Sequence, residues 1–167
     1  MNLKLISLPP FRAAASGVDK VGDFSDGGLL RSFDHFFSSV VPKPEESFMP
    51  RDFLYYDEEN GGMVWLWALT ESGETGGFET VPFEGGLYVT FAYRDGDGET
   101  HDRLHKEAYD YIEASDILEL DIRPNHYSMG HMITPKAVMD AQGWGQMEVF
   151  IPVRLKDDVR KAETGTE

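Results

Sequence analysis

Short segments in which apolar and polar residues alternate occur along most of the chain, a pattern typical of β-strands. The segments that predict strands are 3–16, as one opening strand bent at Pro9 and Pro10, and then 53–56, 63–69, 78–82, 87–93, 125–132 and 147–153. Two other segments, 29–40 and 104–112, carry apolar residues at helical spacing. Few helices among many short strands predict an α+β fold.

The predicted elements form an internal repeat of pattern, because each half of the chain gives a strand, a helix and two further strands. The spacing between the helix markers Leu29 and Leu104 equals the spacing between the strand markers Phe53 and Ser128. Neither half could bury its own sheet, so we expect two duplicated modules within one domain. The expected product is a curved, mostly antiparallel sheet with two main helices and a groove between the halves, where a ligand would bind. This domain would cover residues 1–155, followed by a flexible charged tail at 156–167.

Composition narrows the function classes. The 167 residues include 30 acidic and 15 basic side chains, for a formal charge of -15. Such a surface argues against nucleic acid and against anionic membranes as direct partners, and it is compatible with cationic or neutral small molecules. The chain has no cysteine, which excludes disulfides and thiolate metal sites. With no apolar membrane span and no signal peptide, the sequence predicts a cytoplasmic protein.

Four segments together resemble a known family. They are Leu-Pro-Pro-Phe-Arg-Ala-Ala-Ala at 8–15, Phe-Glu-Thr-Val-Pro at 78–82, Gly-Gly-Leu-Tyr-Val-Thr-Phe at 85–91 and Glu-Val-Phe-Ile-Pro-Val at 148–153. In order and spacing they resemble the GyrI-like small-molecule-binding domain. This is the effector-binding domain of AraC- and MerR-type transcription regulators, expected here in its stand-alone form. The resemblance implies a duplicated fold with an aromatic-lined groove that binds amphipathic, often cationic compounds, and some relatives hydrolyse cyclopropane-bearing cytotoxins.

One departure from the family's pattern affects these expectations. Relatives often carry a buried glutamate within Pro-x-Phe-Glu-x-Tyr, whereas this chain has Pro-Asn-His-Tyr-Ser-Met at 124–129. Tyr127 stands at the glutamate's position, with His126 beside it. The change removes both the expected counter-ion for a cation and the expected general acid or base of the hydrolytic relatives.

Aromatic side chains are the candidate ligand contacts. Trp65 and Trp67 share one face of their strand, where they could line the groove and attract a cation, or could simply cover the sheet. Tyr88 and Phe91 fall on opposite faces of theirs, and the resemblance favours Tyr88 for the groove. The predicted ligand-binding residues are Trp65, Trp67, Tyr88, Phe91, His126, Tyr127 and Trp144.

Candidate catalytic residues are few. His126 could act as a general base near pH 7, and the alternative is that His126 and Tyr127 are simply one buried and one solvated side chain. Glu119 shares a face with Asp121 if that segment is extended, and paired carboxylates can transfer protons when one pKa is raised. Glu148 lies on the strand face opposite Val149, which is either solvent or groove.

The sequence shows no complete motif for binding a metal or a cofactor. His101 and His105 have the i,i+4 spacing of zinc-binding helices, but the glutamate that should follow the first histidine is replaced by Asp102 and no third ligand is visible. A solvated helix face is the expectation for this pair. The sequence also has no phosphate-binding glycine motif, so we expect neither a metal nor a cofactor.

The sequence therefore favours a binding module that senses or sequesters a small amphipathic molecule, as a monomer or homodimer. The alternative is a hydrolase of strained or activated small molecules. A third hypothesis is a protein partner: the strongly acidic surface could mimic nucleic acid and inhibit a nucleic-acid-handling enzyme.

Overall fold

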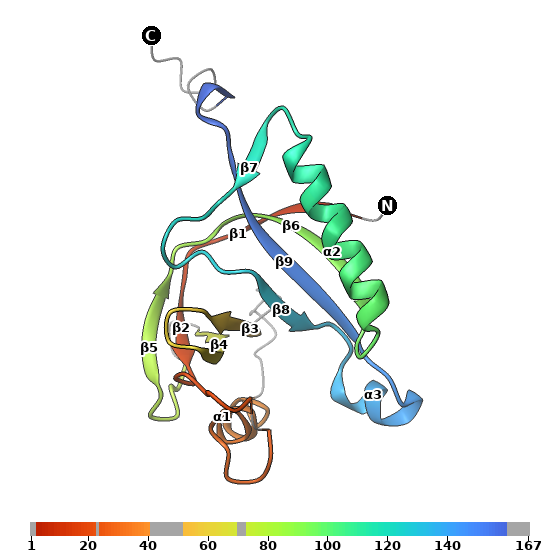
Figure 1. Cartoon of the computed structure of the whole chain (residues 1–167). Helices are drawn as coiled ribbons and strands as arrows, with labels where there is room; N and C mark the ends of the chain where they lie inside the picture. Colours follow the sequence, from red (N-terminus) through yellow and green to blue (C-terminus); the bar gives the residue numbers. More distant parts are fainter. Residues whose placement is uncertain (1–2, 23, 41–51, 70–72, 160–167) are drawn as a thin grey trace. The chain divides into compact units, whose positions relative to one another are not determined.

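The computed structural model describes residues 3–22, 24–40, 52–69 and 73–159 (Figure 1). Contacts group the chain into two compact units. Unit 1 takes its described residues from Met1–Pro9, Gly85–Ser128 and Met132–Glu167, and unit 2 from Pro10–Glu84 and Met129–His131. The chain therefore passes between the units more than once, and each unit is built from segments that are distant in sequence.

Unit 1 is an antiparallel sheet with one long helix. Its strands, in spatial order, are β1 (Lys4–Leu8), β6 (Gly86–Arg94), β9 (Gln146–Leu155) and β7 (Leu118–Leu120). The register places Leu5 opposite Val89 and Val89 opposite Ile151. Strands of this composition form because β-branched and aromatic side chains pack well on a pleated surface.

Helix α2 (Gly98–Glu113) lies along β6 and β9 and covers one face of this sheet (Figure 1). It begins where the Asp97 carboxylate accepts a hydrogen bond from the backbone N–H of Thr100, a typical N-cap. The core beneath it is mainly aliphatic; its buried members are Val89, Phe91, Ala108, Ile112, Leu118, Val149, Ile151 and Val153. Because side chains alternate along a strand, the intervening residues of β6 and β9 point to the other face.

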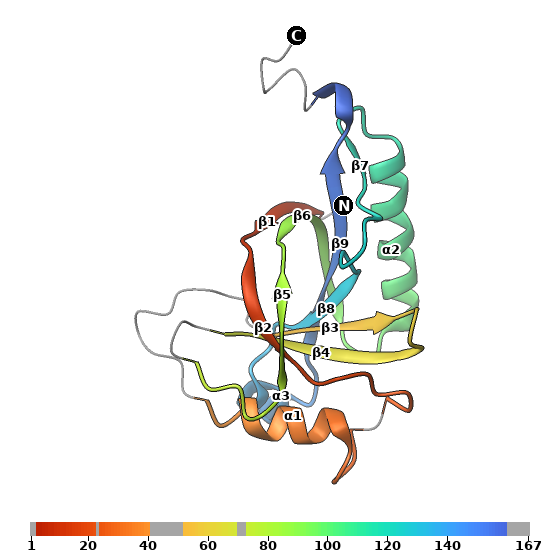
Figure 2. The same cartoon turned by 90° about the vertical axis from the view of Figure 1, so that its left-hand side faces the viewer.

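Unit 2 repeats this plan with different side chains. Its antiparallel strands, in spatial order, are β5 (Glu79–Phe83), β2 (Phe11–Ala15), β4 (Gly62–Ala68), β3 (Asp52–Asp57) and β8 (Met129–Met132), the last contributed through its residues up to His131. Helix α1 (Leu29–Phe37) packs on the sheet face of Trp65 and Trp67, and Figure 2 shows β3 and β4 side by side. The α+β class, the antiparallel pairing and the two main helices agree with the sequence prediction.

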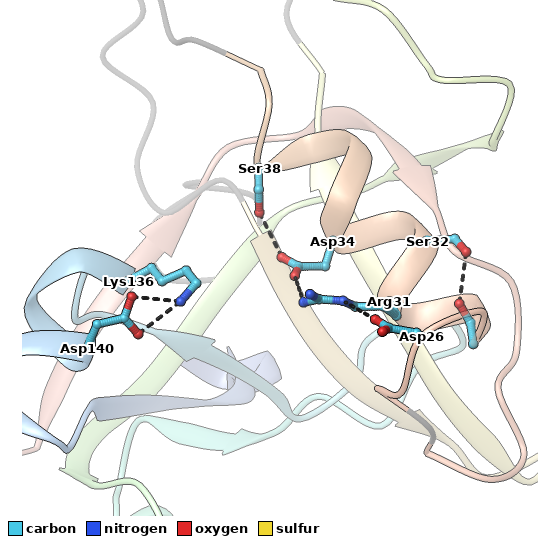
Figure 3. A network of polar contacts seen from close by, with 8 residues as sticks. Asp26, Arg31, Ser32, Asp34, Ser38, Lys136 and Asp140 are labelled. Atoms are coloured by element: carbon cyan, nitrogen blue, oxygen red, sulfur yellow. Dashed lines mark hydrogen bonds and ion pairs between the residues drawn. The ribbon is translucent and has the colours of Figure 1, made fainter.

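The outer surface of α1 is polar and carries an ion-pair network (Figure 3). Arg31 lies 3.3 Å from the Asp34 carboxylate and 3.7 Å from that of Asp26, and the Ser38 hydroxyl donates to Asp34. Exposed pairs of this kind contribute about 0–1 kcal/mol each, so the buried aromatic face of α1 accounts for more of its stability.

Several predicted boundaries were wrong. The predicted strand 125–132 is a strand only over β8; residues 124–125 form a turn, with Asn125 at a φ of 63°. Two elements were not predicted: β7, and the short helix α3 (Lys136–Gln142), which carries a Lys136–Asp140 ion pair (Figure 3). The first helix ends at Phe37 rather than Val40. Of the predicted tail, residues 160–167 lie outside the described residues.

Candidate functional site

The sheet face of unit 1 opposite α2 carries both aromatic and polar side chains. We call it the ligand face and define it by Tyr88, Thr90, Glu148 and Phe150. Tyr88, Thr90 and Phe150 are fully buried, and the register pairs Thr90 with Phe150 across β6 and β9. The Thr90 hydroxyl donates to Glu148 Oε1 at 2.9 Å, and Lys4 Nζ lies 3.9 Å from the same oxygen. Glu148, which the sequence left between solvent and groove, therefore lies mostly enclosed beside a hydroxyl donor.

A turn that follows β7 brings three charged or titratable residues next to this face. The backbone N–H of Asp121 donates to the carbonyl of Pro152, which fixes the turn to β9. The Asp121 side chain is only 2% exposed, and Arg123 donates to both of its oxygens, from Nε at 2.8 Å and from Nη2 at 2.6 Å. These hydrogen bonds from Arg123 hold the pKa of Asp121 below its usual range. Asp121 is thus a buried carboxylate already paired with a cation of the same turn.

His126 is held in this turn by both ring nitrogens. Nη2 of Arg123 lies 3.2 Å from Nε2, and the carbonyl of Pro124 lies 3.1 Å from Nδ1. Arginine can only donate, so toward Arg123 the Nε2 atom accepts, and Nδ1–H donates to the carbonyl; Asp121 Oδ2 lies 3.5 Å from the same Nε2. A general base needs a lone pair that faces its substrate, and in this arrangement the lone pair of His126 accepts from Arg123.

Tyr88 lies at the meeting point of the ligand face and the turn. Its burial raises the pKa of the phenol, and the negative charge of Asp121 raises it further, while Arg123 opposes this. The phenol therefore stays neutral across the physiological range. Period-2 alternation placed Tyr88 and Phe91 on opposite faces, and they are: Phe91 packs in the core beneath α2. Of the two residues, only Tyr88 lies on the ligand face.

In unit 2, Trp65 and Trp67 lie under helix α1. The Phe37 ring stacks on Trp67 with centroids 5.1 Å apart, and Phe33 lies 5.8 Å from Trp65. The two indoles share a face, as expected from their spacing, and that face is the one the helix covers. Of the two alternatives that the sequence left open, this packing favours indoles that cover the sheet.

A histidine–aspartate pair that the sequence did not reveal joins β8 to β3 in unit 2. His131 Nδ1 lies 3.0 Å from Asp52 Oδ1 and 3.2 Å from the Asp52 carbonyl, and Trp65 Nε1 donates to Asp52 Oδ2 at 3.2 Å. A donor at Nδ1 leaves Nε2 as the proton-accepting nitrogen. The register that brings these residues together, with Leu54 opposite Gly130, is a long-range pairing that no local motif announces.

The other predicted site residues lie apart from these clusters. Glu119 forms an ion pair with Arg154 at 2.8 Å. The Tyr127 hydroxyl donates to Asn125 at 3.4 Å, and Trp144 is 42% exposed beneath the Arg94 guanidinium, which lies 5.6 Å from the ring centroid.

Among the described residues, no three His, Asp or Glu side chains are grouped so that they could hold a metal ion. His101 and His105 stack with centroids 5.5 Å apart, and His101 Nδ1 bonds to Asp102. No helix over the same residues has the length and apolar character needed to cross a bilayer.

Comparisons with known proteins identify the fold. No family model and no curated protein matches the sequence. Solved structures do match over nearly the whole chain. The EcmrR C-terminal domain has a TM-score of 0.61 at 15% identity and covers 92% of this chain and 97% of its own. A hydrolase from Listeria innocua has a TM-score of 0.59 at 12% identity, covering 91% of each chain. SAV2435 bound to tetraphenylphosphonium has a TM-score of 0.56 at 12% identity, covering 92% of this chain and 94% of its own. At these identities the likeness shows a shared fold.

Proposed function

We propose that the protein is a small-molecule-binding module whose ligand is amphipathic and contacts the ligand face of unit 1. The observation that carries this proposal is the enclosed carboxylate of Glu148 among Tyr88, Thr90 and Phe150. A buried carboxylate is costly unless it is paired, and a sheet face that serves only for packing has no need of one. The shared fold supports the proposal, because one structure with that fold is bound to a lipophilic cation.

The chemistry of the face defines the ligand class. Phe150 and Tyr88 are fully buried, so a ligand would contact their rings by replacing the side chains that now cover them. Burial of apolar ligand surface stabilises a complex by about 25 cal/mol per Å² before entropy costs. The neutral phenol of Tyr88 can exchange a hydrogen bond with a ligand, and Glu148 can attract a cation. The proposed ligand is therefore an aromatic or polycyclic molecule with one positive or strongly polar group, which fits the effector-sensing role of GyrI-like domains.

Titration calorimetry with tetraphenylphosphonium and its neutral counterpart triphenylphosphine oxide tests this proposal. Glu148→Gln keeps an acceptor for the Thr90 hydroxyl and removes the charge. We expect this variant to bind the cation roughly five- to tenfold more weakly and to bind the neutral compound with nearly unchanged affinity. Glu99→Gln, at the exposed first turn of α2, is the matched control. Absence of binding by both compounds to the folded wild-type protein would refute the proposal.

The hydrolase alternative is supported by a specific observation, the Asp52–His131 pair. In that reaction His131 Nε2 takes a proton from water while the oxygen forms a bond to an electrophilic carbon of the substrate. Asp52 stabilises the resulting imidazolium, which returns the proton to the leaving group. This pair replaces His126 as the candidate base, because the Nε2 of His126 is engaged by Arg123.

Hydrolysis of 4-nitrophenyl butyrate, followed by release of nitrophenolate, tests this alternative. His131→Gln and Asp52→Asn should both lower the rate, because the first removes the proton-accepting nitrogen and the second the carboxylate that orients it. His35→Gln, an exposed histidine on α1, controls for the hydrolysis that any surface imidazole supports. Equal rates in wild type and His131→Gln would exclude the pair as a general base.

A further inference from the structure

Unit 1 contains a cavity on the α2 side of its sheet, away from the ligand face. It has a volume of about 290 Å³ and lies between the C-terminal half of α2, strand β7 and the residue that follows β9. Ile112 and Leu118 form a buried floor, and Tyr109 and Leu120 add apolar wall. A cavity of this size accommodates a small organic molecule with an apolar body.

Charged groups surround the apolar floor, and one of its carboxylates, Glu119, is paired with Arg154 at 2.8 Å. Glu113 and Glu119 contribute carboxylates, and Lys156 contributes the ammonium group. Nζ of Lys156 donates to the carbonyl of Ser115 at 2.6 Å, just beyond the end of α2. The helix also ends here, at Glu113, and a helix C-terminus carries partial negative charge. The ammonium group of Lys156 already meets the negative end of the helix, so the exposed Glu113 carboxylate is the group that favours a positive ligand.

We infer that this cavity is a second binding site, for a small amphipathic monocation such as an arylalkylamine. The aromatic body of the ligand rests on Ile112 and Leu118, and its ammonium group faces the Glu113 carboxylate at the rim. The Tyr109 ring at the wall adds cation–π attraction. The overall charge of -15 raises the local concentration of cations around the whole molecule. This inference is independent of the ligand face, since the two lie on opposite faces of the sheet.

Amide chemical-shift mapping with 2-phenylethylamine tests the inference, with 2-phenylethanol and 3-phenylpropionate as neutral and anionic counterparts. We expect saturable shifts at Leu118, Glu119 and Leu120, with the amine bound more tightly than the alcohol and the carboxylate weakest. Glu113→Gln should lower the affinity for the amine by about two- to fivefold, the range of a partly exposed ion pair. It should not change the affinity for the alcohol. Glu99→Gln on the same helix should change neither.

The outcomes separate this site from the ligand face. Shifts confined to Tyr88 and Thr90 would overturn the second site and leave the proposed function standing. Glu148→Gln should leave the β7 shifts intact, and saturation with tetraphenylphosphonium should not displace the amine from β7. Equal affinity of the amine and the alcohol, or an unchanged amine affinity in folded Glu113→Gln, would also overturn the inference.

Discussion

The strands of the two units follow the same spatial order, but in each unit the edge strand comes from a different part of the chain than the other strands. In unit 1 the order is β1-β6-β9-β7 with α2 after β6, and in unit 2 it is β5-β2-β4-β3 with α1 after β2. In each unit, the edge strand comes just before the strand that leads into the helix of the other unit. Strand β1, at the edge of unit 1, is followed along the chain by β2 of unit 2. Strand β5, at the edge of unit 2, is followed by β6 of unit 1. The repeat is thus a repeat of topology in which edge strands are exchanged. The exchange covalently ties the two units at Pro9 and at Glu84.

The units differ most in how they use aromatic and polar side chains. The core of unit 1 beneath α2 is mostly aliphatic, whereas the cluster of unit 2 beneath α1 is mostly aromatic. Unit 1 encloses its carboxylates, Asp121 and Glu148, beside donors of its own chain. Unit 2 instead presents a histidine oriented by a carboxylate, His131 with Asp52. The comparison sets a unit that encloses paired carboxylates against one in which a carboxylate orients a histidine.

The largest expected effect breaks the aromatic core of unit 2. Phe33 is 1% exposed and contacts Phe37, Trp65 and Phe78. Phe33→Ala should lower the free energy of unfolding by about 3–5 kcal/mol, since a buried ring leaves a cavity that neighbours fill only partly. Urea denaturation followed by tryptophan fluorescence measures it. Leu29→Ala, at the more exposed start of the same helix, should cost far less; equal losses would show that the ring cluster is not the core of this unit.

A second, intermediate effect targets the buried carboxylate of unit 1. Asp121→Asn removes the charge that Arg123 binds with two hydrogen bonds and should cost about 2 kcal/mol near neutral pH. Because the folded-state pKa of Asp121 lies below its unfolded value, its contribution is full above the unfolded pKa of about 3.9 and is lost as pH falls through the folded pKa. The wild type and variant should therefore converge in acid. Denaturation curves at several pH values measure this, and a constant difference would contradict it.

The same comparison shows how far sequence patterns reach. Alternation of apolar residues located β4, β6 and β9 within a residue or two and put Tyr88 and Phe91 on opposite faces, because strand periodicity is local. It missed β7, a three-residue strand defined by its pairing with residues 153–155 of β9. It missed the Asp52–His131 pair for the same reason, since partners 79 positions apart are brought together by register alone. The turn that holds His126 depends on the positive φ of Asn125, which the predicted strand did not anticipate.

The smallest expected effect is a pH-dependent change in stability caused by His105 of α2, which belongs to unit 1. Burial lowers the pKa of His105, and the neighbouring His101 lowers it further, while Asp102 opposes both. The unfolded chain, with a histidine pKa of about 6.5, therefore binds more protons than the folded chain as the pH falls through that value. Stability should accordingly decline from about pH 8 to about pH 5 through this residue.

His105→Gln should flatten that decline in melting temperature, because it removes a group whose protonation favours the unfolded chain. His35→Gln in unit 2 is the matched control, because this side chain is exposed on α1. A decline that persists in His105→Gln but disappears in His35→Gln would reverse the assignment. That outcome would identify His35, in unit 2, as the pH-sensitive group. The other histidine of unit 2, His131, is paired with Asp52.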